Sequence, residues 1–386
     1  MYDIAIAGGG VIGSSIAYHL TRSGRAGRVA VIEPDPTYEF ASTPRSAGGI
    51  RRLFSLPENI QMSAFSLDFY LDFERLTAVN GDTTKLDFRR QGYLFLYPPE
   101  KLAVVEKNYA AQRQLSCPVH LLDRAGIARL FPSLGLNDIA AGVHSPEDGW
   151  MDPYSAVRGF RRKALAQGAD YIKDRVVGVE LSGKRANAFR LAQGERIEAK
   201  VFINAAGAWA GEICQTIGMK LPIEPLRRLA FYFEIQQALE KLPLVKDLSG
   251  LFFRPEGVGY ITGVPNMSEP AGINFDVDYD YFDNVVWPLL ARRAPAFEAL
   301  KVKRGWAGMY DQNRFDGNLL IGPWEGQVDN FHVAVGFSGH GLQQAPAVGL
   351  ALSELVLDGR FSTIDLSRLR YRRVMDGTPV REEGII

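Results

Sequence analysis

Cysteine is scarce in this chain. The 386 residues include only Cys117 and Cys214, which lie far apart and in no spacing typical of a metal site. The sequence therefore predicts neither a disulfide framework nor a zinc site, and we expect no bound metal. Two reduced thiols suit a reducing compartment, so we expect a cytoplasmic protein.

An excess of either charge is also missing. Lys and Arg together number 44, as do Asp and Glu, so the formal net charge is zero. This balance gives no reason to expect a nucleic acid or an anionic membrane as partner. No apolar run reaches the ~18 residues typical of a transmembrane helix. A strand expected from residue 2 onward leaves no room for a leader peptide, and we expect none.

Glycine, by contrast, is concentrated near the start of the chain. Residues 2–7 predict a strand and residues 11–22 a helix, with the run GGGVIG at 8–13 between them. A second predicted strand, 28–32, ends at Glu33. Glycines in this setting, with an acid after the next strand, are typical of a dinucleotide site. The helix N-terminus favours a pyrophosphate. A carboxylate at Glu33 suits the ribose hydroxyls and argues against NADP.

Later segments predict the rest of the fold. Strands are expected at 200–204 and 331–335, each leading into a glycine-containing turn and a helix. Between about 222 and 302, short strand-like pieces divided by turns predict a mixed or antiparallel sheet. We therefore expect an α/β chain with a discontinuous Rossmann-type nucleotide-binding domain and an inserted α+β substrate domain. The expected boundaries are 1–80, 146–215 and 305–386 for the first domain, and 81–145 and 216–304 for the second.

Two features favour FAD over NAD as the dinucleotide. The small, polar and basic segment 42–52 (STPRSAGGIRR) can fold over a planar cofactor while donating backbone N–H groups and arginine charge. The turn 336–341 (GFSGHG) opens a second helix, expected over 342–357. One helix end can then face the pyrophosphate and the other the isoalloxazine.

These motifs together resemble the D-amino-acid-oxidase-like family of FAD oxidoreductases, which includes sarcosine oxidase, glycine oxidase and dimethylglycine dehydrogenase. The resemblance rests on GGGVIG with Glu33, on the segment 42–52, on INAAGAWA at 203–210 and on GFSGHG at 336–341. It extends over nearly the whole chain. It implies FAD as cofactor and the fold described above.

The resemblance also implies a set of FAD contacts. Gly8, Gly10 and Gly13 would hold the pyrophosphate, Glu33 the adenosine ribose, and Val176 the adenine through its backbone. The other residues that it places along the cofactor are Val11, Ile12, Pro34, Ser42, Arg45, Ser46, Ala47, Gly48, Gly49, Ala206, Gly207, Trp209, Gly308, Tyr310, Gly336, Gly339, His340, Gly341, Leu342 and Gln343.

Two departures from the family bear on how FAD is held. Sarcosine oxidase attaches its flavin to a cysteine just before a Met-Tyr pair, and Gly308 stands at that position here. Dimethylglycine dehydrogenase uses a histidine in the loop that corresponds to 42–48, which contains no histidine in this chain. We therefore expect non-covalent FAD.

In this family a neutral amine loses hydride from its α-carbon to flavin N5, and the imine is then hydrolysed. The resemblance thus implies a small amino acid or N-substituted amino acid as substrate. Arginine suits its carboxylate, and the candidates are Arg51, Arg52 and Arg254. Arg52 is favoured because it aligns with a carboxylate-binding arginine of sarcosine oxidase. Tyr260 aligns with a tyrosine at the edge of the active site, and His340 is expected to contact flavin or substrate.

The sequence leaves alternatives open for both the electron acceptor and the class of reaction. Sarcosine oxidase activates O2 with a lysine on the segment corresponding to roughly 255–300, and this chain has no lysine between Arg254 and Lys301. Gln343 also replaces a carboxylate-binding lysine, which argues against sarcosine itself. We favour a dehydrogenase that passes electrons to a quinone or carrier protein over an oxidase that uses O2. A FAD-dependent 2-hydroxy-acid dehydrogenase, and an assembly or interaction protein with structural FAD, stay open.

Overall fold

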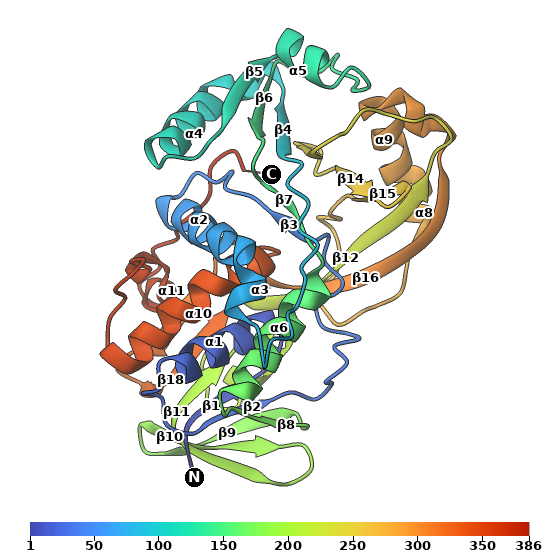
Figure 1. Ribbon diagram of the computed structural model, residues 1–386. Coiled ribbons are helices and arrows are strands. Elements are labelled where there is room, and N and C mark those ends of the chain that lie inside the picture. The colour runs from blue at the N-terminus through green and yellow to red at the C-terminus, as the bar shows by residue number, and fades with distance from the viewer. Residues whose placement is uncertain (386) are drawn as a thin grey trace.

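The computed structural model describes residues 1–385, which form two large β-sheets with helices packed on both (Figure 1). The first sheet has the order β17-β18-β11-β1-β2-β8, and β9 and β10 extend it from β11. Its strands β1, β2, β8, β11 and β18 run parallel, whereas β17 is antiparallel. The strands are β1 (Tyr2–Ala7), β2 (Val29–Ile32), β8 (Asp170–Ile172), β9 (Val176–Ser182), β10 (Arg185–Leu191), β11 (Arg196–Asn204), β17 (Leu320–Trp324) and β18 (Val328–Val335).

Helices cover both faces of this sheet, whose central strands β1 and β2 are buried on both sides. The burial of β1 and β2 is almost complete, and their side chains divide between two cores. One core lies beneath α1 (Val11–Arg22), α2 (Pro57–Leu71), α6 (Pro153–Ala166) and α10 (Gly341–Asp358), and the other includes α7 (Ala210–Gln215). The N-cap of α6 is Asp152, which accepts hydrogen bonds from the N–H groups of Tyr154 and Ser155. This cap and Pro153 at the first helical position are the ordinary chemistry of a helix start.

The second sheet has the order β16-β12-β15-β14-β13-β4-β6-β5 and is largely antiparallel, with β13 and β4 parallel. It gathers strands from three separate stretches of the chain (Figure 1). They are β4 (Tyr93–Tyr97), β5 (His120–Asp123), β6 (Ala141–Ser145), β12 (Ile223–Glu234), β13 (Leu244–Asp247), β14 (Phe252–Glu256), β15 (Gly259–Gly263) and β16 (Lys301–Asn313). The expected α/β class, with a parallel-dominated sheet and a separate mixed sheet, is confirmed.

The two faces of the second sheet have different neighbours. Leu94, Val245, Phe253 and Phe233 lie in a core beneath α5 (Arg124–Leu130) and α9 (Trp287–Arg293). Tyr93, Phe95, Tyr97 and Leu244, from the opposite face, pack with Leu53 and Phe54 of the chain that leads into α2. Because side chains alternate along a strand, this division assigns every residue of the sheet to one of the two faces.

Some expected boundaries differ from the structure. The boundary proposed at residue 305 falls inside β16, which pairs with β12 from Lys301 to Asn313. The small sheet of β3 (Gly49–Ile50) and β7 (Gly149–Trp150) joins the segment 42–52 to the chain before α6. The remaining helices are α3 (Phe73–Leu76), α4 (Leu102–Gln114), α8 (Tyr279–Tyr281) and α11 (Arg372–Met375).

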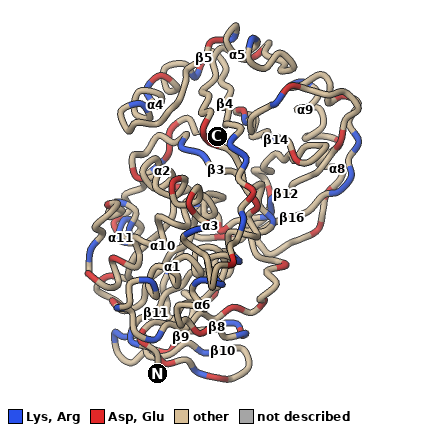
Figure 2. The backbone as a smooth tube through the Cα atoms, viewed as in Figure 1, with Lys and Arg blue, Asp and Glu red and all other residues tan. Residues whose placement is uncertain are grey.

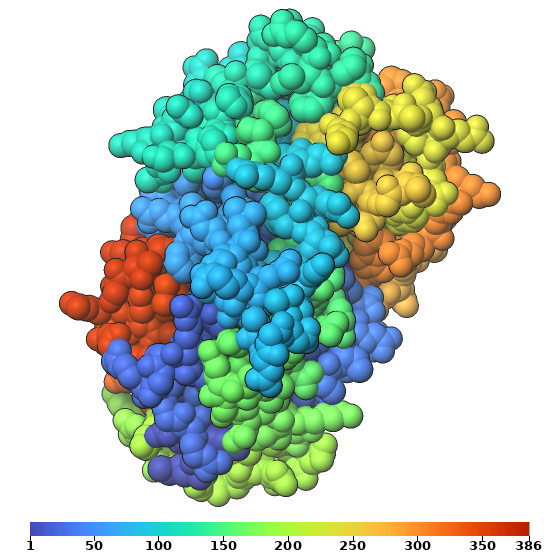
Figure 3. All heavy atoms as spheres, viewed as in Figure 1, coloured from blue at the N-terminus to red at the C-terminus, as the bar shows by residue number. Residues whose placement is uncertain are grey.

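Charge is mixed over the molecule. Figure 2 shows basic and acidic residues interspersed along the whole tube. Figure 3 shows the region of α2, in blue, at the centre of one face, between the teal residues of the second sheet and the red residues near α10 and α11. Among residues 1–385, no helix combines the length and apolar character needed to cross a bilayer.

Candidate active site

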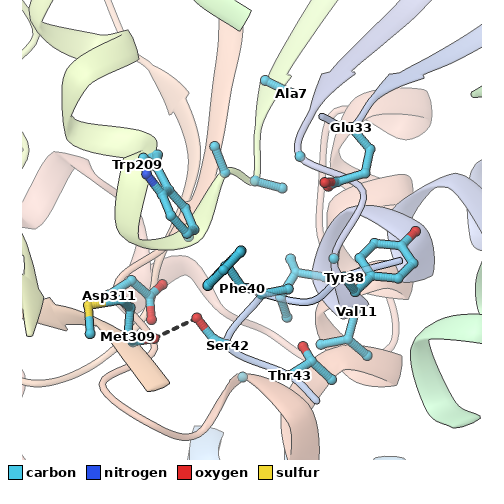
Figure 4. A pocket seen from close by; sticks show the side chains of 18 of the residues that line it. Ala7, Val11, Glu33, Tyr38, Phe40, Ser42, Thr43, Trp209, Met309 and Asp311 are labelled. Atoms are coloured by element: carbon cyan, nitrogen blue, oxygen red, sulfur yellow. Dashed lines mark hydrogen bonds between the residues drawn. The ribbon is translucent and has the colours of Figure 1, made fainter. Parts of the chain in front are cut away.

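A groove runs between the two helix N-termini that the sequence singled out. Gly10, Val11 and Ile12 at the start of α1 line it, as do Gly341 and Leu342 at the start of α10. Each helix directs N–H groups and a partial positive charge at the groove, which therefore favours an anion. Figure 4 shows Glu33, Tyr38 and Trp209 around it, with Phe40 between them.

Most of the residues expected along a cofactor line this groove. From the sequence-based set they are Gly8, Gly10, Val11, Ile12, Glu33, Pro34, Ser42, Ser46, Val176, Ala206, Gly207, Trp209, Tyr310, Gly339, Gly341 and Leu342. The other expected residues are not part of its lining: Gly13, Arg45, Ala47, Gly48, Gly49, Gly308, Gly336, His340 and Gln343. Residues that the sequence pattern did not single out include Tyr38, Phe40, Arg175, Met309 and Asp311.

The glycine turn is shaped by close backbone contacts. Gly8 has φ +94°, and a Cβ there would lie 2.5 Å from the carbonyl oxygen of Ala205. A Cβ on Gly13 would lie 1.9 Å from the carbonyl oxygen of Gly8. A Cβ on Gly10 would meet no protein atom within 4 Å, because it would point into the groove. Gly8 and Gly13 thus allow close packing of the backbone, and Gly10 leaves room for a ligand.

Glu33 is held at the end of β2 by two backbone donors. Its carboxylate accepts hydrogen bonds from Gly9 N–H at 2.8 Å and Asp35 N–H at 2.9 Å. Burial raises its pKa, and these two N–H groups oppose the rise. The carboxylate remains directed at the groove (Figure 4), where the hydroxyls of a ribose can donate to it.

The segment 42–52 is fastened to the second sheet. Ser42 Oγ donates to the Met309 carbonyl at 2.5 Å (Figure 4), and Arg45 Nη1 donates to the Ala307 carbonyl at 2.8 Å. Gly308 lies against Arg45, since a Cβ there would be 3.2 Å from Arg45 Cβ. Arg45 therefore serves to hold the loop on β16, with its side chain directed at carbonyl oxygens.

Asp311 fixes the second glycine turn, and sequence reasoning missed it. Its carboxylate accepts hydrogen bonds from Gly336 N–H at 2.7 Å and Phe337 N–H at 3.2 Å. Burial raises the pKa of Asp311 to about 6. The sequence signal that could have found it is a charged residue, Asp311, directly after Met309 and Tyr310 near the end of a buried strand. A carboxylate buried in such a place requires hydrogen-bond donors.

At the α10 end, Arg51 and His340 come together. Arg51 Nη2 lies 3.0 Å from His340 Nε2. A guanidinium can only donate, so Nε2 must accept and the imidazole must be neutral. Burial, with Arg51 and Lys246 adding to it, holds the pKa of His340 well below its usual value. The backbone N–H of Arg51 donates to Gln343 Oε1 at 3.0 Å, so Gln343 positions Arg51.

The Arg51 guanidinium lies in an aromatic cage. Its Cζ is 4.9 Å from the ring centre of Phe54, 5.5 Å from Phe95 and 5.9 Å from Tyr93. Arg51 forms no ion pair with a carboxylate anywhere in residues 1–385, and its Nε is buried without a hydrogen-bond partner. A buried cation of this kind is suited to an anionic ligand.

Arg52, the arginine that the sequence favoured for binding a substrate carboxylate, is paired with acidic side chains of the protein. Its Nε donates to Asp148 at 2.8 Å, its backbone N–H donates to the same carboxylate at 2.9 Å, and its Nη2 lies 3.4 Å from Glu147. Asp148 is fully buried. The Arg52 charge is therefore neutralised inside the protein by these two carboxylates.

Arg254 and Tyr260 also differ from expectation. Arg254 lies on the sheet face directed at the groove, but its Nε donates to the Ala47 carbonyl at 2.7 Å and its Nη1 pairs with Glu256. It therefore holds the segment 42–52 in place. Tyr260 lies on the far face, stacked on Phe233 at 5.5 Å and packed against Phe297. The expectation that it borders the active site is wrong, because strand alternation turns it into the opposite core.

Comparison with known proteins identifies the family. The model of the FAD dependent oxidoreductase family matches residues 3–355. The chain belongs to this family. It is 40% identical over 423 residues to FAD-dependent oxidoreductase domain-containing protein 1 of Xenopus laevis, covering 100% of this chain and 85% of the relative.

Two further relatives have named activities. Mitochondrial dimethylglycine dehydrogenase of Homo sapiens is 26% identical, covering 96% of this chain and 44% of that enzyme. The crystal structure of L-proline dehydrogenase from P. horikoshii superposes with a TM-score of 0.88 at 27% identity, covering 98% of this chain and 99% of that one. The resemblance stated from the sequence is confirmed.

The groove suits the FAD of this family. It offers two helix N-termini, an acceptor at Glu33, and an open approach at Gly10 where no protein atom would meet a side chain. When bound, FAD supplies a two-electron acceptor. No cluster of three or more His, Cys, Asp or Glu side chains suited to a metal occurs in the described chain.

Replacement of Gly10 by alanine tests this fit. Since φ is −61° and no protein atom lies near the added methyl, we expect the apo-protein to melt as the wild type does. The methyl occupies the groove, so FAD affinity is expected to fall by about tenfold or more. Flavin fluorescence titration of apo-protein measures this. Gly211→Ala is the control, because its Cβ meets only a carbonyl oxygen at 3.5 Å. Equal affinities for both variants would contradict this placement of FAD.

Proposed function

We propose that this chain oxidises the C–N bond of a small amino acid whose nitrogen carries a carbon substituent. Support comes from the related enzymes, which by name act on dimethylglycine and on L-proline, both N-substituted amino acids. FAD held between the starts of α1 and α10 would supply the two-electron acceptor for hydride from the α-carbon, and the imine product would then be hydrolysed in water. FAD is held without a covalent bond, since Gly308 and the histidine-free loop 42–48 offer no attachment site.

One observation carries the proposal: a buried arginine, which pairs with no carboxylate of residues 1–385, stands in the aromatic cage beside the start of α10. Arg51 offers a fork of donors that matches a carboxylate. Its neighbours Phe54, Tyr93 and Phe95 exclude water and so strengthen that pairing. The amine nitrogen and the α-carbon of a bound amino acid then lie next to the carboxylate, within the same enclosed site.

His340 helps to position Arg51 and carries no charge itself. Its pKa is held well below the usual value, so the ring stays uncharged near neutral pH and accepts from Arg51. A neutral histidine beside the arginine does not compete with it for the carboxylate. The N–H groups at the start of α10 are directed at the groove and favour negative charge there. An amine that binds unprotonated needs no further base.

The electron acceptor is proposed to be a quinone or a carrier protein, which makes the enzyme a dehydrogenase. The names of both related enzymes support this. Hydrogen peroxide is then expected only in trace amounts during turnover. Peroxide formed in proportion to substrate would show O2 to be the acceptor.

The test is anaerobic flavin bleaching by three groups of compounds: N-methyl amino acids with proline, primary amino acids, and 2-hydroxy acids. The N-substituted amino acids are expected to bleach the flavin fastest. Bleaching by hydroxy acids alone would establish a 2-hydroxy-acid dehydrogenase instead, and no bleaching by any compound would favour a structural role for FAD. The same preparation, precipitated with acid, is expected to release its yellow colour into the supernatant. Colour retained in the pellet would contradict non-covalent binding.

A further inference from the structure

Residues 380–385, here called the tail, lie against the chain that leads into α2 (Figure 1). The Gly384 carbonyl accepts a hydrogen bond from Tyr97 Oη on β4 at 3.2 Å. Ile385 packs on the core that contains Tyr97 and Phe54. The tail therefore joins the second sheet to the chain just before α2.

The N-terminus of α2 is capped from the tail. Its N-cap residue is Leu56, whose side chain carries no oxygen. The carboxylate of Glu382 accepts hydrogen bonds from Ser55 N–H at 2.6 Å, Leu56 N–H at 3.2 Å and Asn59 Nδ2 at 2.6 Å. Ser55 Oγ donates to the same carboxylate. Free N–H groups and a partial positive charge at a helix start favour a carboxylate there, so Glu382 serves as the cap.

The capped segment also carries one wall of the Arg51 cage. Phe54, which directly precedes Ser55, lies 4.9 Å from Arg51 Cζ and packs edge-on against His340, with ring centres 5.1 Å apart. The Phe54 carbonyl accepts from Gln112 Nε2 at 3.0 Å, and the side chain is fully buried. In a close-packed interior, a shift of Ser55 therefore displaces a ring that contacts both Arg51 and its partner His340.

A second connection runs from Glu382 through Asn59 to the first turn of α10. Asn59 Nδ2 donates to Glu382, and Asn59 Oδ1 accepts from Gln344 Nε2 at 3.0 Å. Gln344 directly follows Gln343, whose Oε1 accepts from the Arg51 N–H at 3.0 Å. Glu382 is thus connected to Arg51 on two sides, through the cage wall and through α10.

We propose that Glu382 is a positioning residue for substrate, and that its carboxylate holds residues 53–59 so that the Arg51 fork is preorganised for the substrate carboxylate. This inference rests on the proposed function. A guanidinium that is already held in place loses less freedom when it binds, which favours affinity. The three described residues that donate to the Glu382 carboxylate do not belong to the lining of the FAD groove. Substrate affinity is therefore expected to depend on Glu382, and FAD affinity is not.

Binding of butyrate to the holoenzyme, measured by calorimetric titration, tests the proposal without turnover. Glu382→Ala is expected to weaken binding about tenfold, and Glu382→Gln, which keeps one acceptor oxygen, about threefold. Glu383→Gln is the matched control, because the neighbouring Glu383 side chain is exposed and pairs with Lys107 on α4. It is expected to bind butyrate as the wild type does. Wild-type affinity in both Glu382 variants would overturn the proposal.

A second background distinguishes positioning of Arg51 from a general loss of stability. Arg51→Lys retains a charge but has no planar fork to orient. Adding Glu382→Ala to Arg51→Lys is therefore expected to weaken butyrate binding less than twofold, although Glu382→Ala lowers the melting temperature equally in both backgrounds. A full tenfold loss in the Arg51→Lys background would show that Glu382 does not act through Arg51.

Turnover separates this inference from the proposed function. With any amine that bleaches the flavin, Glu382→Ala is expected to raise KM about tenfold and to leave kcat within twofold of the wild type. Weaker butyrate binding in Glu382→Ala, with no bleaching by any amine, would leave the positioning of Arg51 standing and refute the proposed function. Oxidation of an amine with the same KM in Glu382→Ala and the wild type would refute the positioning role and leave the proposed function standing.

Discussion

Replacing Arg51 by methionine is expected to lower kcat/KM for an amino-acid substrate by about 10²- to 10³-fold while the protein remains folded. The substrate carboxylate loses its charge-assisted hydrogen bonds, each contributing roughly 1.5–3 kcal/mol. Stability is preserved because Arg51 pairs with no carboxylate of the described residues 1–385 that would be left unpaired, and methionine fits among Phe54, Phe95 and Tyr93. Steady-state kinetics and thermal melting measure the two effects.

Arg51→Lys is the informative companion variant. It retains the positive charge but loses the planar fork, so an intermediate loss of about tenfold is expected. The loss in both variants is expected mainly in KM, since the carboxylate is bound equally in the ground state and the transition state. An Arg51→Met enzyme with the kcat/KM of the wild type would show that the carboxylate is bound elsewhere.

Replacing the next residue, Arg52, by methionine is expected to lower the stability of the protein and to leave substrate binding near normal. It leaves the carboxylate of Asp148, which is fully buried, without its charged partner. Breaking one side of a buried ion pair costs roughly 3–5 kcal/mol of unfolding free energy. Denaturant titration measures this loss, and the fraction that stays folded is expected to keep a near-normal KM.

The double replacement Arg52→Met with Asp148→Leu serves as the control. It removes both charges, so it is expected to recover part of the stability lost in Arg52→Met. If Arg52→Met were as stable as the wild type and raised KM as Arg51→Met does, the assignment of roles to these two neighbours would be reversed.

The cofactor groove was largely predictable from the sequence because its signals are local. Gly8, Gly10 and Gly13 lie within one turn, and Glu33 ends the next strand, so spacing alone places them together. The second glycine turn is equally local. Even here Asp311 escaped notice, since its partners Gly336 and Phe337 lie on another strand connection.

The substrate-binding part of the site was less predictable from the sequence. It depends on which face of a strand each residue occupies and on contacts between segments that are far apart in the chain. Adjacent arginines diverge, with Arg51 at His340 and Arg52 at Asp148, and no pattern in the sequence distinguishes them. One step of strand alternation directs Tyr260 into the far core. Tyr93 and Phe95 reach Arg51 from β4, in a separate part of the chain.

The central claim is that Arg51 holds an amino acid by its carboxylate for oxidation by FAD. Anaerobic stopped-flow bleaching tests this most directly, because it needs no external electron acceptor. The preferred amino acid is compared with its carboxamide, which has the same size but no negative charge, in the wild type and in Arg51→Met. We predict rapid bleaching of the wild type by the acid, bleaching at least 100-fold slower by the amide at equal concentration, and little difference between the two in Arg51→Met. Equal bleaching of the wild type by acid and amide would contradict the claim.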